Sequence, residues 1–239
     1  MLYQKPKFQI SYRIFYLILL VAGITSDCMS YAGKPHNEAF VYYTVQSNVI
    51  CGVLALIFLI RACKGLHHKM TILDLSDNFS IEIDKKTKIL TSLQCLASVW
   101  ILITCLIYNT LLGNPFSIDY WTKNLHNPIL HLFCPILFIL DFLLFSKKNI
   151  IKPFIPALCV TYPYIYILYI YIRSLHLKNL FTNAIPDSLV VYPYFFLDFD
   201  NLGISGVIRW VFILTIIFVS LGYLLLAIYT KLGKKRASH

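Results

Sequence analysis

Charge is scarce in this chain. Only 13% of its 239 residues are charged, while 58% are hydrophobic and the mean hydropathy is +0.69. A soluble domain carries about 25% charged residues, so a water-facing surface could not be covered here. Intrinsic disorder is excluded as well, because it requires low hydrophobicity and high charge. The composition therefore predicts an integral membrane protein.

Clustered cysteines and internal repeats are also missing. The seven cysteines lie within apolar runs or at their ends, and no two form a C-x-x-C pair. Disulfide frameworks and metal knuckles both need cysteines gathered on loops, so we expect neither a metal site nor a cofactor. The tripeptide Tyr-Pro-Tyr occurs at 162–164 and 192–194 in different surroundings. An inverted-repeat transporter is therefore not indicated.

Acidic residues are few. Eleven Asp and Glu oppose 21 Lys and Arg, which gives a net charge of +10. Such a balance often indicates a nucleic-acid partner. Here the basic residues occupy short segments between long apolar runs, so they mark one side of a membrane instead. We expect no nucleic-acid partner.

Six apolar runs are long enough to cross a membrane as helices, which takes roughly 20 residues each. Outer-membrane strands would alternate polar and apolar residues, whereas these runs are continuously apolar. We therefore predict an all-α, polytopic bundle of six transmembrane helices that forms a single membrane domain over residues 1–239. The predicted spans are 8–29, 40–63, 89–112, 125–145, 150–173 and 207–231.

The basic residues predict the orientation. With the N-terminus inside, sixteen of the 21 fall in the inner segments, and every inner segment is basic. Cytoplasmic segments are enriched in Lys and Arg, so we predict that both termini are cytoplasmic. The longest outer loop is then 174–206. Five basic residues remain outside: Lys34, Lys123, Arg173, Lys178 and Arg209.

A strongly polar side chain at membrane depth is costly and is a functional hypothesis by default. Thr44 and Asn48 share one face of the second span because they are four residues apart. Thr44 lies roughly 6 Å below the outer end of its helix and His131 roughly 9 Å, at 1.5 Å per residue. The topology thus predicts nearly the same depth for both side chains.

Pro135 follows His131 by one helical turn. Proline has no N–H for the carbonyl four residues earlier, and that carbonyl belongs to His131. We therefore expect a kink at this turn. A carbonyl freed within a membrane needs another partner, so we also expect polar groups or water beside His131.

A hydroxyl becomes a nucleophile when a base within hydrogen-bonding reach takes its proton. Thr44 as the nucleophile and His131 as its base would form a minimal acyl-transfer pair. Asn48 and Asn127 are the candidate oxyanion donors. No residue that would orient the histidine is evident in the sequence, although an aspartate of the outer loop could fold back.

Structural interpretations compete at each position. Threonine in a membrane helix commonly bonds a carbonyl one turn earlier, asparagine joins helices, and a buried histidine can pair with a polar neighbour. Asp141 is expected to pair with an inner basic residue such as Arg61. In the outer loop, Asp198 is expected to pair with Arg209 ahead of any catalytic role.

The pattern resembles two groups of membrane proteins. Tyr43-Thr44 with Ser47-Asn48 at the start of the second span, His131 with Pro135, and Tyr-Pro-Tyr-x-Phe-Leu-Asp at 192–198 are similar to the bacterial six-span Pr-six-Pr family. Through the topology, Thr44 and His131, the chain more remotely resembles the androgen-induced FAR-17a-like family. Its members hydrolyse esters of hydroxy fatty acids with an intramembrane threonine and histidine. That resemblance implies Thr44 as nucleophile and His131 as base.

Three hypotheses follow. The first is a hydrolase of lipid acyl esters whose amphiphilic substrate enters laterally from the outer leaflet. The second is a protein that binds or transports a small solute in a polar cavity, and the third is a structural partner subunit. Membrane lipids are the expected partners, and the oligomeric state is not specified by the sequence. The abundance of Ile, Lys, Asn and Tyr indicates an AT-rich genome and a bacterial inner membrane.

Overall fold

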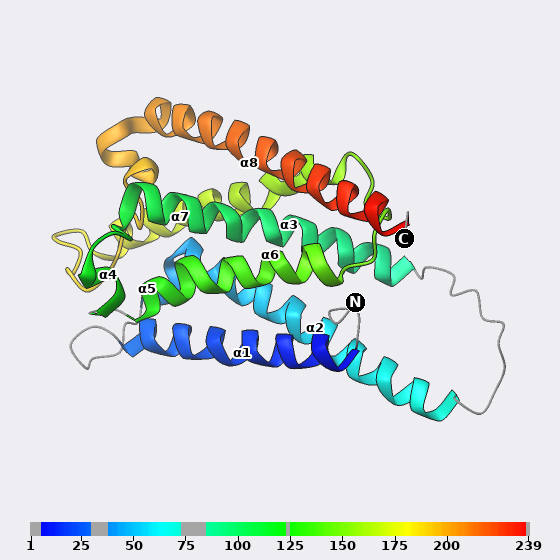
Figure 1. The fold of residues 1–239 in the computed structure, drawn as a ribbon. Helices are drawn as coiled ribbons and strands as arrows, with labels where there is room; N and C mark the ends of the chain where they lie inside the picture. Colours follow the sequence, from blue (N-terminus) through cyan, green and yellow to red (C-terminus); the bar gives the residue numbers. More distant parts are fainter. Residues whose placement is uncertain (1–5, 30–37, 73–84, 123–124, 238–239) are drawn as a thin grey trace.

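Six long helices lie side by side in a computed structural model of the protein (Figure 1). It describes residues 6–29, 38–72, 85–122 and 125–237, with the side chains of 66–72 and 235–237 left aside. Each helix is long and apolar enough to cross a membrane, and the described residues contain no strand. The predicted all-α bundle of six spans is confirmed. The spanning segments are Pro6–Met29, Tyr43–Gly65, Lys85–Leu112, His126–Phe145, Ile155–Leu180 and Phe199–Lys234.

Helix α3 (Lys85–Ile107) lies at the centre of the bundle. Cys95, Ala97, Val99 and Ile101 on this helix are fully buried. It packs against α2 (Tyr43–Ile72), α6 (Cys134–Phe145) and α8 (Phe199–Ala237). Small residues allow membrane helices to approach closely, so the cysteines pack as small apolar groups here.

The fifth and sixth spans differ from their predicted bounds. The fifth begins as a 3₁₀ turn, η5 (Ile155–Val160), continues as α7 (Thr161–Leu180), and so extends past Arg173. The sixth, α8, starts at Phe199 rather than 207. Hydropathy had excluded both extensions because they carry charges. In the structure Arg173 pairs with Glu38 and Lys178 with Asp200, and the outer connection shrinks to 181–198.

Gly203 interrupts α8 near its start. Its φ of 63° lies in the left-handed region, which glycine adopts without the strain a Cβ would bring. Beyond it the helix runs straight to the other end of the bundle (Figure 1).

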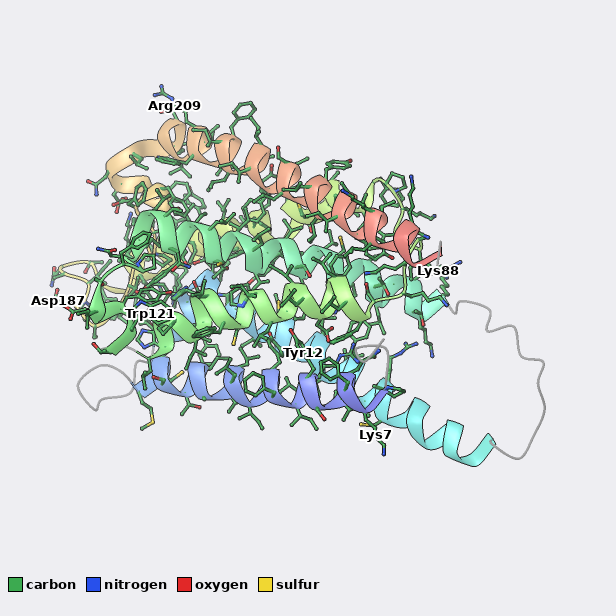
Figure 2. The ribbon with its side chains drawn as sticks, viewed as in Figure 1. Lys7, Tyr12, Lys88, Trp121, Asp187 and Arg209 are labelled. Carbon is green, nitrogen blue, oxygen red and sulfur yellow. The ribbon has the colours of Figure 1, made fainter. Side chains whose placement is uncertain are left out.

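Short helical turns gather at one end of the bundle (Figure 1). They are η2 (Ala39–Val41), α4 (Ile118–Thr122), α5 (His126–Pro128) and η6 (Phe195–Leu197). Trp121 and Asp187 mark this end in Figure 2, and Lys7 and Lys88 mark the opposite one. Both ends of the described chain lie at the Lys7 end, as an even number of spans requires. By the excess of basic residues, the predicted orientation places that end on the cytoplasmic side, and we call the opposite end the outer one.

Candidate functional site

A cavity of about 200 Å³ lies among the helix ends on the outer side of the bundle. We call it the outer cavity. Thr44 and His131 both line it, so the two residues proposed as a pair face one space. Five segments that are distant in sequence contribute to its wall. Its other lining residues are Asp27, Tyr42, Val45, Tyr108, Leu112, His126, Asn127, Leu130, Pro193 and Tyr194.

Thr44 lies in the first turn of α2 and is 8% exposed. Its side chain hydrogen-bonds to the Tyr194 hydroxyl, which comes from the outer connection. The backbone N–H groups of Thr44 and Tyr43 also reach the Tyr194 oxygen. Burial raises the pKa of Tyr194 to about 12, although these hydrogen bonds oppose the rise. The tyrosine oxygen thus occupies the N-terminus of α2, where helix N–H groups lack partners within the helix.

His131 lies in a wide π-turn, η4 (Ile129–Phe133), that leads into α6. Its carbonyl accepts a hydrogen bond of 2.9 Å from the Asn109 Nδ2. The expected need for a new partner, caused by Pro135, is confirmed, and the kink takes the form of the π-turn. Tyr120 in α4 donates to the Asn109 Oδ1 at 2.8 Å and holds that amide in place.

The His131 ring is held by stacking. It lies parallel to the Tyr108 ring, with 3.3 Å between centroids and 2° between planes. Tyr108 in turn donates from its hydroxyl to the Asn127 Oδ1 at 2.7 Å. Within the described residues the buried His131 Nδ1 has no hydrogen-bond partner. The ring is therefore positioned by an aromatic face instead of the carboxylate that orients histidine in many hydrolases.

The two candidate oxyanion donors, Asn48 and Asn127, differ in whether a side-chain N–H group remains available to donate. Asn48 donates from Nδ2 to the carbonyls of Thr44, at 2.9 Å, and Leu130, at 3.1 Å. Both of its N–H bonds are thereby used, so it ties α2 to η4 one turn deeper than Thr44. Asn127 lines the outer cavity and uses its Oδ1 for Tyr108, which leaves its amide nitrogen as a possible donor.

A second hollow adjoins the outer cavity. This apolar pocket of about 60 Å³ lies between α2, α3, α7 and α8. Thr44, Tyr108, Leu112 and Tyr194 line both spaces. Thr44 therefore stands where a polar space meets an apolar one.

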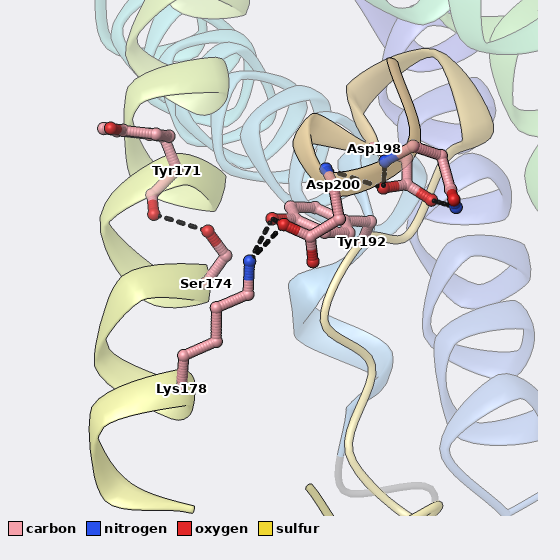
Figure 3. A network of polar contacts seen from close by, with 7 residues as sticks. Tyr171, Ser174, Lys178, Tyr192, Asp198 and Asp200 are labelled. Carbon is pink, nitrogen blue, oxygen red and sulfur yellow. Dashed lines mark hydrogen bonds and ion pairs between the residues drawn. The ribbon is translucent and has the colours of Figure 1, made fainter. Parts of the chain in front are cut away.

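The outer connection 181–198 is held by two basic residues of α7, each of which also forms an ion pair. Arg173 on α7 binds Glu38 and the Val190 carbonyl. Lys178 on the same helix binds Asp200 and, at 3.0 Å, the Tyr192 hydroxyl (Figure 3). These contacts fix the segment that carries Tyr194 against the site.

Asp198 does not pair with Arg209, so this prediction is wrong. Its Oδ1 accepts from the backbone N–H groups of Asp200 and Asn201, each at 3.0 Å, and so caps the start of α8 (Figure 3). Arg209 projects away from the bundle (Figure 2). Capping wins because free N–H groups lie two and three residues from the carboxylate.

A second polar centre lies in the inner half of the bundle. Asp141 on α6 accepts from the Arg13 Nε at 2.8 Å, and Arg13 and Asp141 are 5% and 3% exposed. The Gln94 Nε2 donates to its other oxygen. The expected partner Arg61 instead binds Thr87 at 2.7 Å. The sequence assigned Arg13 only to the inner side of the membrane. Its contact with Asp141 depends on how the first span packs against α6.

No family model, curated protein or solved structure matches this chain. The six helices identify a multi-pass membrane protein. Tyr108, Asn109, Tyr120 and Tyr194 complete the site and were not chosen from the sequence. Asn109 carried a signal, since it is an amide near the outer end of an apolar run. The three tyrosines carried no such signal in the sequence, because tyrosines are common at membrane interfaces.

Proposed function

We propose that the protein hydrolyses acyl esters of membrane lipids, with Thr44 as the nucleophile and His131 as the general base. The observation that supports this best is that both side chains line one outer cavity of about 200 Å³. A cavity of about 150 Å³ holds benzene in another protein, so a small polar group fits in this one. The adjoining apolar pocket would receive the start of an acyl chain.

The chemistry needs two proton transfers in each half-reaction. The Thr44 Oγ1 attacks the ester carbonyl carbon while His131 takes its proton. The alcohol then leaves with the proton from His131, and the acyl group remains on Thr44. Water attacks this second ester, again through His131, which releases the acid and restores the Thr44 hydroxyl.

Both groups must adjust for this chemistry. Among the described contacts no hydrogen bond joins Thr44 to His131, and the Thr44 side chain is bonded to Tyr194. Catalytic hydrogen bonds commonly form only in the substrate complex. We propose that substrate displaces Tyr194 and lets the Thr44 hydroxyl turn to the imidazole.

The N-terminus of α2 supplies the oxyanion site in this proposal. The N–H groups of Tyr43 and Thr44 now meet the Tyr194 oxygen, and an oxyanion would take its place. Helix N-termini stabilise negative charge through such groups. This assignment replaces Asn48, whose N–H bonds are used by two carbonyls, and leaves Asn127 as a supporting donor.

The resemblance to the Pr-six-Pr and FAR-17a-like families belongs to this proposal, as does residence in a bacterial inner membrane. The Thr44 and His131 positions carry the resemblance to the second family. Solute binding in the same cavity is the competing function.

Labelling with a fluorescent fluorophosphonate tests the proposal without knowledge of the substrate. The purified protein in detergent should label, and Thr44→Ala and His131→Ala should each lose the label. Thr110→Val is the matched control, because the exposed Thr110 hydroxyl bonds the Leu106 carbonyl at 2.7 Å outside the cavity. Absence of labelling in a folded wild type, beside a reactive control enzyme, would favour solute binding.

A further inference from the structure

An apolar groove runs along the outer half of the bundle between α7 and α8. We call it the α7/α8 groove; its volume is about 520 Å³. Its walls include Ile167 and Leu168 on α7 and Val207, Ile208 and Val211 on α8. Leu168 and Ile208 are 57% and 60% exposed, so the groove is open on the side where lipid would lie.

The groove lies next to the apolar pocket, which in turn adjoins the outer cavity. Ile167 lines both the groove and the apolar pocket, and Thr44 lines both the apolar pocket and the outer cavity. Near the middle of the bundle the Tyr164 hydroxyl bonds the Thr215 Oγ1 at 2.8 Å, which bridges α7 and α8. The three hollows therefore lie in a row, from an apolar opening in the outer half of the bundle to polar groups near the outer surface.

The charge of the outer cavity narrows the choice of headgroup. Among the described residues, those that line it include one carboxylate, Asp27, but no lysine or arginine. Asp27 lies 3.6 Å from His126, and the nearby Arg173 is paired with Glu38. A phosphate or carboxylate headgroup would find no fixed positive charge there and would be repelled by Asp27. Hydroxyl groups could bond to the asparagine, tyrosine and aspartate side chains.

We propose that the ligand is a single-chain lipid with an uncharged hydroxylated headgroup, such as a monoacylglycerol. Its acyl chain lies in the α7/α8 groove and its headgroup in the outer cavity. The lipid enters laterally from the outer leaflet between α7 and α8. This inference rests on the proposed function for its ester bond, but the binding it describes does not require catalysis.

Photo-crosslinking tests the inference. Thr44→Val protein in phosphatidylcholine vesicles is exposed to a monoacylglycerol that carries a diazirine near the end of its chain, and the modified peptides are mapped by mass spectrometry. We expect crosslinks on the groove walls of α7 and α8. Excess monooleoylglycerol should compete at least fivefold better than lysophosphatidic acid of the same chain, because only the latter is anionic.

Two obstructing variants and one control sharpen the result. Ile167→Trp and Ile208→Trp fill the groove from opposite walls and should each reduce crosslinking at least fivefold. Ile165→Trp places the same ring on the lipid-facing side of α7, 64% exposed and outside the groove, and should change it less than twofold. Size-exclusion chromatography verifies that each variant is folded, and one folded obstructing variant suffices.

Crosslinks spread evenly over the lipid-facing helices, or equal competition by lysophosphatidic acid, would overturn the inference. The outcome of this experiment is independent of the outcome of the test of the proposed function. Groove crosslinks in a protein whose wild type resists fluorophosphonate would uphold this inference and refute hydrolysis. Fluorophosphonate labelling of Thr44 without groove crosslinks would do the reverse.

Discussion

Replacing Arg13 by methionine should destabilise the protein more than almost any other single change. Arg13 and Asp141 are 5% and 3% exposed, and the Nε–Oδ1 distance is 2.8 Å. Arg13 also donates to the Phe58 carbonyl at 3.3 Å, so its guanidinium joins α1 (Pro6–Met29) to α2 and α6. Removing the cation leaves a buried carboxylate with the Gln94 amide as its remaining partner.

Breaking a buried pair on one side costs about 3–5 kcal/mol, whereas replacing both partners by apolar groups is often close to neutral. We therefore expect Arg13→Met and Asp141→Leu to lower the free energy of unfolding by about 3–5 kcal/mol each. The double variant should recover most of the loss. Arg61→Met is the control: the Arg61 side chain is exposed, and we expect a change within about 0.5 kcal/mol.

The assay is reversible unfolding in mixed micelles, followed by circular dichroism as the share of denaturing detergent rises. A double-mutant cycle then gives the coupling energy between the two positions. Single variants within 1 kcal/mol of the wild type, or a double variant with the summed loss of both singles, would refute the reasoning about a buried pair.

Three further predictions concern the outer end. Asn109→Leu removes the hydrogen bond to the His131 carbonyl and should lower the free energy of unfolding by about 1–3 kcal/mol in the same assay. A stability equal to that of the wild type would contradict this role of Asn109. Arg173→Met breaks the pair with Glu38 and should speed protease cleavage within 181–198, which an unchanged cleavage rate would contradict. Asp198→Ala should remove the cap of α8, at about 1 kcal/mol, and speed hydrogen exchange at the first α8 amides. Despite the opposing effect of slight burial, hydrogen bonds from Asn201 lower the pKa of Asp198, so the cap is complete above about pH 4 and is lost as the pH falls through the lower folded value. As the pH falls, exchange at these amides in the wild type should approach the rate in Asp198→Ala at the same pH. A ratio of the two rates that does not change with pH would refute this.

Hydropathy was sufficient to predict the six spans, because an apolar run of roughly 20 residues in a membrane must satisfy its backbone hydrogen bonds internally as a helix. It failed at the end of α7 and at the start of α8, where the extensions beyond the predicted spans carry Lys178 and Asp200. The two charges neutralise each other in an ion pair between α7 and α8. A hydropathy average over neighbouring residues counts each charged residue but not the distant partner that neutralises it.

Local backbone chemistry was also predictable. The lack of an N–H at Pro135 implied a new partner for the His131 carbonyl, and the structure supplies Asn109. Which residue it would be could not be foreseen, since Asn109 lies 22 positions away on another helix. The same limit applies to Asp141, for which the sequence suggested Arg61 and packing provided Arg13.

The outer cavity illustrates what depth along a helix can and cannot give. Counting residues placed Thr44 and His131 at nearly one depth, and both line the same space. Rotation about the helix axes, the stacking of Tyr108 and the arrival of Tyr194 depend on packing among five segments. Tyr194 now occupies the place proposed for the oxyanion. Tyr194 was therefore beyond sequence reasoning.

The most direct test of the account is to locate the atom that reacts. Wild-type protein treated with a fluorophosphonate is digested, and the phosphonyl group is mapped by tandem mass spectrometry. Thr44 shares this region with other hydroxyls, among them those of Ser47, Thr104, Tyr108 and Tyr194, so the position of the adduct identifies the oxygen that reacts. The account predicts the adduct on Thr44, with loss of the adduct in His131→Ala. An adduct on any other hydroxyl of this region, or one that His131→Ala leaves intact, would contradict it.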